Sequence, residues 1–350
     1  MKENQAKEGG SNNPSSKTGP GTLRALALAA LAGATVLTST GCAPVTDAVK
    51  GVFVDEGFPA LPAPEIATYI VDLSGSTYPI KQLQALGSGI EEFVSGSSLG
   101  DPFSSPKVAP KSLSIQFITE NSANGGRISI VSAKTGIELH EWATNNTPNL
   151  DQAEQLWRGF RQARTELATS QIQDVSECQQ RAVDLFGQQG LSQSSLRQPA
   201  KTICNDIIRT QNALEQLKAF VTDPEVPLGS DVYGAVDMAV SNLKTAEMQF
   251  PMSRKTLVIA SDLIDQSPER SLVSRIKSSA SNKDICEMAK GDLGEEYGKG
   301  LPFQDIYVVI VGQANSKADT ELLNKVRKYW TCYFQSAGAE VIQTTDLNNY

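Results

Sequence analysis

The chain has 350 residues, 40% of them hydrophobic, and a formal net charge of −8 at pH 7. This apolar content is enough for a core in one large domain or two ordinary ones. The acidic balance, without a cluster of Lys or Arg, argues against nucleic acid as a partner. A single histidine, His140, excludes a histidine-rich zinc site, and we interpret it as an ordinary structural residue.

Residues 1–41 are typical of an export signal. Basic residues precede an apolar run over 25–37, which is too short to span a bilayer but suits a signal peptide. Small residues then lead into Cys42. The segment resembles a bacterial lipobox, in which the signal is cut before the cysteine and that cysteine carries lipid. The resemblance implies an exported protein held at the bacterial cell envelope by a lipid on Cys42. A plain signal peptide cut nearby is the alternative.

Residues 42–64 form the next predicted unit. Prolines 59, 62 and 64 crowd its end, and prolines at this density favour an extended tether over a packed element. The tether would hold a folded domain, residues 65–350, away from a membrane.

The folded domain opens with an apolar run over residues 66–71, which predicts a buried parallel strand. Asp72, Ser74 and Ser76 follow it at once, and ligands of open α/β sheets collect where such strands end. Carboxylate and hydroxyl oxygens are hard ligands of the kind that Mg²⁺ or Mn²⁺ accepts. The pattern therefore predicts an oxygen-ligated metal site.

The remaining pattern predicts a doubly wound α/β fold. Apolar residues 83, 86, 90 and 93 recur at helical spacing, and the strands over 112–118 and 127–131 are separated by an Asn-Gly-Gly turn typical of a hairpin. Further strands are predicted over 256–260, 306–311 and 340–343, with a helix that opens at Ser316 and stops near Gly338. We expect a mostly parallel central sheet, one antiparallel edge strand and helices on both faces.

Residues 148–222 are expected to be a helical insertion. One amphipathic helix is predicted over 150–167 and another over 203–220, with a stretch rich in Gln and Ser between them. Because it leads toward Ser230, we expect the insertion beside the metal site, where it either shapes the choice of partner or is an enlarged structural layer.

The cysteines other than Cys42 number four, and an even count in an exported chain suggests two disulfides. Four cysteines permit three pairings, and by proximity we favour Cys178 with Cys204 and Cys286 with Cys332. The first bridge would join the two helices of the insertion. Buried free thiols are the alternative.

Two further segments lead to the same edge of the predicted sheet. Residues 227–231 form a turn that contains Ser230 and begins a helix, and the strand over 256–260 runs into Asp262. Three loops would thus bring five oxygen ligands together: Asp72, Ser74, Ser76, Ser230 and Asp262. The alternative is that these side chains only cap helix N-termini.

This constellation resembles the von Willebrand factor type A domain, also known from integrin I domains, and its metal-ion-dependent adhesion site. The family pattern is Asp-x-Ser-x-Ser after the first strand, a Thr before a middle helix and an Asp that ends the fourth strand. Here these roles fall on Asp72, Ser74, Ser76, Ser230 and Asp262, with Ser230 in place of the usual Thr. The resemblance implies a VWA/Rossmann-like fold and a divalent cation that captures an Asp or Glu carboxylate of a partner protein.

An enzyme is the competing interpretation. A haloacid-dehalogenase-like phosphatase also places Asp residues after parallel strands with Mg²⁺ between them, but it requires a second carboxylate at the position of Ser74. Since the sequence also shows no general base or activated nucleophile, we expect no enzyme. A third possibility is a type A fold that serves as a scaffold and leaves its metal site unused.

Overall fold

The computed structural model describes part of the chain, all of it within the compact unit of residues 53–350. The described residues are 59–72, 96–122, 126–130, 132–170, 172, 174–186, 191–222, 229–266, 272–278, 281–311 and 319–344. The predicted export signal, Cys42, Ser74, Ser76 and the helix expected around residues 83–93 lie outside them.

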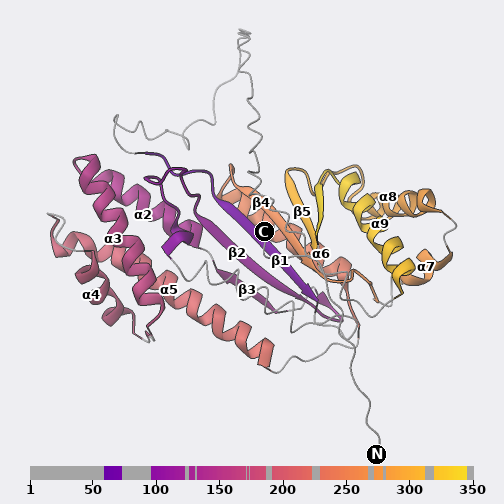
Figure 1. Cartoon of the computed structure of the whole chain (residues 1–350), viewed down its shortest axis with the longest axis horizontal. Coiled ribbons are helices and arrows are strands. Elements are labelled where there is room, and N and C mark those ends of the chain that lie inside the picture. Colours follow the sequence, from indigo (N-terminus) through magenta and orange to yellow (C-terminus); the bar gives the residue numbers. More distant parts are fainter. Residues whose placement is uncertain are drawn as a thin grey trace, which may run out of the picture. The chain divides into compact units, whose positions relative to one another are not determined.

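A six-stranded sheet forms the centre of this unit (Figure 1). Its order is β3-β2-β1-β4-β5-β6, and only β3 is antiparallel to its neighbour among these strands. The strands are β1 Glu65–Asp72, β2 Lys111–Ile118, β3 Arg127–Ile130, β4 Arg254–Ala260, β5 Ile306–Val311 and β6 Glu340–Thr344. The structure thus confirms the doubly wound, mostly parallel sheet with one antiparallel edge strand.

One face of the sheet is covered by helices from the second half of the chain. These are α6 Val232–Gln249, α7 Leu272–Ser278, α8 Asn282–Tyr297 and α9 Thr320–Ser336. Alternate strand residues such as Ile70, Ile259 and Ile310 point into this core, because side chains along a strand alternate between the two faces. Figure 1 shows α6 running back along the strands, so it starts beside the ends of the parallel strands and finishes beside their starts.

The opposite face of β1, β2 and β3 is covered by α5 Gln193–Thr222, a helix of 30 residues. Ala213 and Leu217 of α5 pack against Val71 and Phe117. The side chains of these two strand residues point to the face opposite the core that contains Ile70. Helices therefore lie on both faces, as the alternation of strand and helix predicts.

The helical insertion holds three helices rather than the two we predicted: α3 Leu150–Ala168, α4 Val175–Leu185 and α5. They form a separate core together with α2 Ser132–Asn146 and the short turn η1 Gly96–Leu99. Cys178 lies on α4, so its bridge to Cys204 joins α4 to α5 and does not join the two helices that we expected. The sequence missed α4 because only Cys178, Ala182 and Val183 are buried on it.

One helix boundary differs from the prediction, and three further helices were not predicted. Helix α9 begins at Thr320 and not at Ser316, because the carboxylate of Asp319 accepts hydrogen bonds from the Glu321 and Leu322 amides and caps it. It ends as predicted, with Gly338 at a positive φ of 93°. Helices α2, α7 and α8 have no counterpart in the prediction.

Residues 59–64, which we assigned to the tether, contact the folded domain. The carbonyl of Pro59 lies 3.0 Å from Nε2 of His140, and the carbonyl of Pro64 accepts a hydrogen bond from the Arg254 amide. Leu61 packs against the core of the insertion. We call residues 59–64 the lead-in segment; its prolines do not keep it free of the domain.

Candidate functional site

The candidate site lies at the carboxyl edge of the sheet, by which we mean the C-terminal ends of the parallel strands. Three described segments meet there: residues 119–122 after β2, residues 229–232 at the start of α6 and residues 261–266 after β4. The Asp231 amide donates to the carbonyl of Thr119, and the Gln266 amide donates 2.8 Å to the carbonyl of Ser230. The backbone therefore fixes the loops to one another.

Asp72, the last residue of β1, is fully buried at this edge. Its Oδ2 accepts a 2.7 Å hydrogen bond from Oγ of Ser261, and the same Oγ accepts one from the Leu263 amide. Since Ser261 directly precedes Asp262, this bond places the ends of β1 and β4 side by side. The convergence predicted for Asp72 and Asp262 is thus present in the fold.

Ser230 is 1% exposed, and its Oγ has no hydrogen-bond partner in the described part of the chain. The sequence left open that this hydroxyl caps the following helix. The cap of α6 is instead Asp231, whose Oδ1 accepts from the Gly234 amide. Burying a hydroxyl without a hydrogen-bond partner costs roughly 1–3 kcal/mol of folding free energy. The fold of the described residues therefore buries Ser230 Oγ at a cost and gives it no structural hydrogen bond in return.

Asp262 is also buried, at 1% exposure, and its Oδ1 accepts from the Ile264 amide. The loop after it is held firmly, because Leu263 adopts a positive φ of 63° and its carbonyl accepts from Nε1 of Trp330. A non-glycine residue in this conformation is strained. Several contacts therefore determine the direction in which the Asp262 loop leaves the sheet.

Asp265 was missed at the sequence level, whereas Asp231 belongs to the turn over 227–231 whose hydroxyl and carboxylate were expected to face a bound ion. Oδ1 of Asp265, which is 1% exposed, accepts 2.9 Å from the Val232 amide in the first turn of α6. The carboxylate of Asp231 also accepts from the Ser122 amide. Both carboxylates join loops to one another, and the signal for Asp265 was only that it follows the predicted Asp262 by three positions.

Two tyrosines link the first turn of α6 to α9. The hydroxyls of Tyr233 and Tyr329 lie 2.5 Å apart, and Asp292 accepts from Tyr329 and from Arg275. Burial raises the pKa of both tyrosines well above the ordinary value of 10, so they stay protonated and act as hydrogen-bond donors at neutral pH.

Within the described residues, no group of three or more His, Cys, Asp or Glu is arranged to hold a metal ion. The predicted ligand set has only two carboxylates, Asp72 and Asp262, and takes its other oxygens from serines. The structure brings Asp72, Ser230 and Asp262 to one edge, whereas Ser74 and Ser76 lie outside the described residues. Carboxylate and hydroxyl oxygens are the donors that Mg²⁺ and Mn²⁺ prefer, so the described part of the set matches such an ion in donor chemistry.

Most of the helical insertion does not sit beside this edge as we expected; only the second half of α5 comes near it, where Leu217 packs with Val71, the residue before Asp72. Nε1 of Trp157 donates to the carbonyl of Gly100, and Arg161 pairs with Asp101. Residues 100 and 101 precede β2, so α3 contacts the chain near the starts of the strands. Figure 1 shows α2, α3 and α4 together, away from the arrowheads of β1 and β2. The reason is the length of α5, which carries the other helices away from Ser230.

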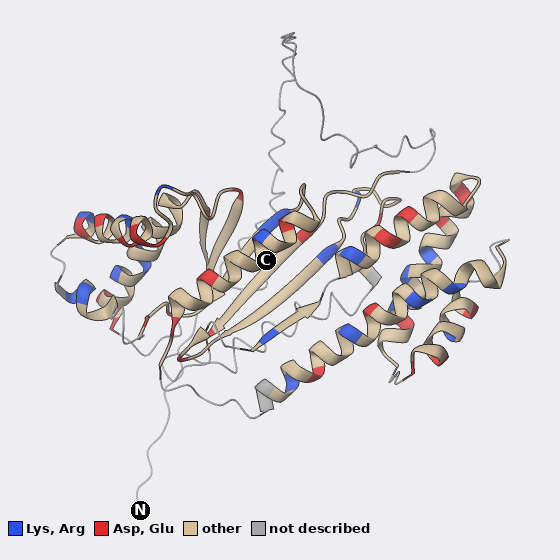
Figure 2. Cartoon of the chain, turned by 180° about the vertical axis from the view of Figure 1, so that it is seen from behind, with Lys and Arg blue, Asp and Glu red and all other residues tan. Residues whose placement is uncertain are grey.

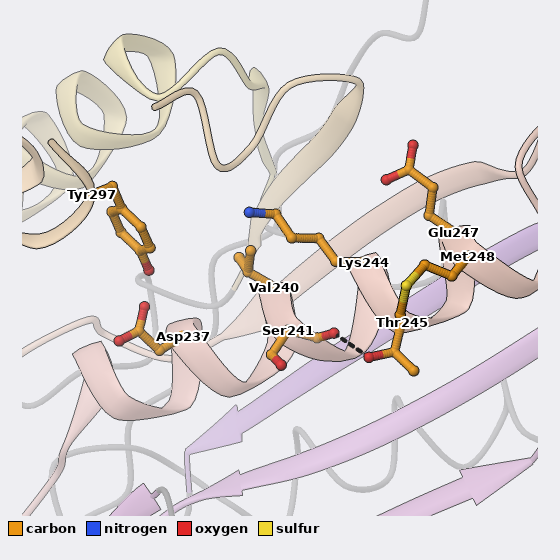
Figure 3. Close-up of a pocket in the computed structure, with 8 residues that line it drawn as sticks. All are labelled: Asp237, Val240, Ser241, Lys244, Thr245, Glu247, Met248 and Tyr297. Carbon is orange, nitrogen blue, oxygen red and sulfur yellow. Dashed lines mark hydrogen bonds between the residues drawn. The ribbon is translucent and has the colours of Figure 1, made fainter. Parts of the chain in front are cut away.

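A hollow of about 550 Å³ lies along the outer side of α6, apart from the carboxyl edge. Figure 3 shows Asp237, Lys244 and Met248 rising from the helix, with Tyr297 of α8 across from Asp237. It runs along the helix and does not reach the residues of the carboxyl edge.

Two disulfides, Cys178–Cys204 and Cys286–Cys332, are present in the pairing that we favoured. Disulfides indicate an oxidising compartment outside the cytoplasm. No helix in the described part of the chain has the length and apolar character to cross a membrane.

Comparison with known proteins identifies no relative: no protein-family model matches the chain, and neither does any curated protein sequence.

Proposed function

We propose that this protein is a von Willebrand factor type A-like binding domain that captures an acidic side chain of a partner protein through a divalent cation. The ligands would be Asp72, Ser74, Ser76, Ser230 and Asp262. The observation that carries the proposal is the unpartnered, buried Oγ of Ser230 at the edge where Asp72 and Asp262 are also buried.

The chemistry follows from the charges of the ligands. Serine hydroxyls bring no charge, so a set with two carboxylates at most leaves a bound Mg²⁺ or Mn²⁺ able to accept another anionic oxygen. When bound, the ion supplies that open position. The residues of the chain hold the ligand oxygens in place: Ser261 orients Asp72 by its hydrogen bond, and Asp265 fixes the first turn of α6 beside Ser230.

We also propose that the protein is held at the bacterial cell envelope by a lipid on Cys42. The two disulfides support export. The site lies at the ends of the strands, whereas the chain enters the domain at the start of β1. A strand of 8 residues spans about 26 Å, so the lead-in segment and the carboxyl edge lie at opposite ends of the sheet.

The test is a thermal melt of the wild type beside Asp72→Ala, with added MgCl₂ or MnCl₂ and then with chelator. We expect the ion to raise the melting temperature of the wild type only, since a ligand of the folded state stabilises it. Affinity capture under the same conditions then tests the partner, which should be lost both with chelator and with the variant. A wild type that does not respond to either ion would favour the scaffold, and turnover of a phosphate ester would favour the phosphatase.

A further inference from the structure

Large apolar side chains gather at the end of the sheet where the parallel strands start. Of the four exposed ones in the described part of the chain, Met248 (78% exposed) and Met252 (82%) stand just before β4, and Leu301 (53%) stands before β5. The fourth, Leu150 at 43%, begins α3. Single exposed apolar residues are ordinary, but a group at one place marks a contact surface.

The same end carries exposed basic side chains, although the whole chain has a net charge of −8. Lys107 donates to the carbonyl of Ala60 in the lead-in segment, and Arg254 opens β4 with its side chain 64% exposed. Lys244 precedes Met248 by one turn of α6. Figure 2 shows Lys and Arg at this end of α6 and at the starts of the neighbouring strands.

Two acidic groups nearby are paired with basic ones. Glu247 accepts from Lys255 at 2.8 Å, and Glu65 lies within 4.0 Å of both Lys111 and Arg254. Glu141 lies near Lys107, so on the side of α6, β1, β2 and β4 the five basic residues named in these two paragraphs stand against three carboxylates. Asp305 and Glu340 are exposed on the side of β5 and β6. The positive surplus is therefore confined to the side that carries Met248 and Met252, which suits an anionic partner rather than a second copy of an acidic chain.

The path of the chain indicates which anionic partner is near. The lead-in segment joins β1 at this end, and Cys42 precedes residue 59 by 17 positions. A fully extended chain of that length reaches at most about 60 Å. If Cys42 carries lipid, as the proposed function has it, a bilayer lies within that reach of the lead-in segment, which joins the domain at this end.

We propose that this surface, formed by Met248, Met252, Leu301, Lys107, Lys244 and Arg254, docks on an anionic lipid bilayer. The two methionines and the leucine enter the interfacial region, and the basic groups lie against lipid phosphates. The domain then stands on the membrane with its carboxyl edge turned outward. This proposal depends on the proposed function in one respect: the lipid on Cys42 is what brings a bilayer near the surface.

The test uses a chain of residues 43–350, which has no lipidated cysteine. Both disulfides and every described contact lie within residues 59–344, so this chain keeps them. Its binding is measured by co-sedimentation with phosphatidylcholine vesicles that contain about a third phosphatidylglycerol, an anionic lipid. We expect binding that Met248→Ser with Met252→Ser weakens tenfold or more. Leu150→Ser, the matched control on α3, should bind as the wild type does. No binding by the wild type, or equal binding by the double variant, overturns the proposal.

Oxidation of methionine by peroxide gives a second measurement without any variant. We expect vesicles to slow sulfoxide formation at Met248 and Met252, while Met288 on α8, which packs against the main core, serves as the internal reference. Unchanged rates overturn the proposal. So does a double variant that changes self-association but not vesicle binding, because the surface would then be an interface between copies. Lipid labelling of Cys42 and the thermal melts with Mg²⁺ or Mn²⁺ are separate measurements. They can support the proposed function even when vesicle binding contradicts this proposal.

Discussion

Replacing Ser230 by Ala separates a metal ligand from a structural serine by the sign of its effect on stability. A structural serine loses a hydrogen bond when it becomes Ala, and the protein is destabilised. Ser230 Oγ is buried and unpartnered in the described part of the chain. Its removal therefore takes away a desolvation cost and breaks no hydrogen bond.

The expected magnitude follows from that cost. Burying an unsatisfied hydroxyl costs roughly 1–3 kcal/mol, and we expect Ser230→Ala to raise the free energy of unfolding by about 1 kcal/mol without divalent cations, the low end of that range. Ser261→Ala is the matched control, because Ser261 is buried at the same edge but donates to Asp72 and accepts from Leu263. A hydrogen bond to a charged group contributes about 1.5–3 kcal/mol, so this variant should be destabilised by about 2 kcal/mol.

The assay is urea unfolding of the wild type and both variants, with chelator and then with saturating Mg²⁺. A ligand at one hundred times its Kd stabilises the folded state by about 2.7 kcal/mol, and we expect this increment in the wild type and much less of it in Ser230→Ala. A loss of stability in Ser230→Ala with chelator present would refute the reasoning, because the hydroxyl would then have a partner. A full Mg²⁺ increment in that variant would remove Ser230 from the ligand set.

Three other predictions concern the rest of the domain. Asp206→Asn should cost about 3–5 kcal/mol in urea unfolding, because it leaves the guanidinium of the fully buried Arg164 without its 2.7 Å carboxylate partner; replacing both residues by Leu should cost less. Gly136→Ala should sharply lower the melting temperature, since the added Cβ would clash with the backbone carbonyl of Leu99 in η1. Gly291→Ala in α8 is the control: its Cβ meets nothing within 4 Å, so the variant should raise the free energy of unfolding by about 0.5–1 kcal/mol. Burial lowers the pKa of His140, so the folded state binds its proton less readily and stability should fall as pH drops below about 6.5; the NMR titration of this single histidine measures the pKa, and a value above 6.5 would contradict the prediction.

The strands could be predicted closely because buried parallel strands are short, continuous apolar runs. The run at residues 306–311 became β5 without a change of boundary. Helix α8 carries a helical signal that the prediction overlooked, with Ile285, Ala289 and Leu293 at intervals of four, whereas α2 lacks such a signal. On α2 the buried residues include Ser132, Thr135 and Gly136, so a small and polar stripe faces the core and no apolar period appears. At α9, Ser316 and Asp319 are both good capping residues, and only the structure shows that Asp319 caps the helix.

The site could be predicted in part, for topological reasons. Parallel strands end at one edge, so Asp72 and Asp262 had to come together once β1 and β4 were neighbours. The cap that Asp231 forms on the Gly234 amide is local, so the sequence could have indicated it. The bonds from the Ser122 amide to Asp231 and from the Val232 amide to Asp265 could not be inferred, because tertiary packing brings those groups together.

The position of the insertion changes how it can affect partner choice. Helix α5 has 30 residues and is therefore about 45 Å long. Its first half, which carries Cys204, belongs to the core that contacts the strand-start end, and its second half lies under the sheet, where Leu217 packs. The disulfide thus stabilises a part of the molecule remote from Ser230. If the insertion influences a partner at the carboxyl edge, it must do so through the last turns of α5, so substitutions there test the idea. Deleting residues 178–204 would instead remove buried side chains of the second core and would test folding.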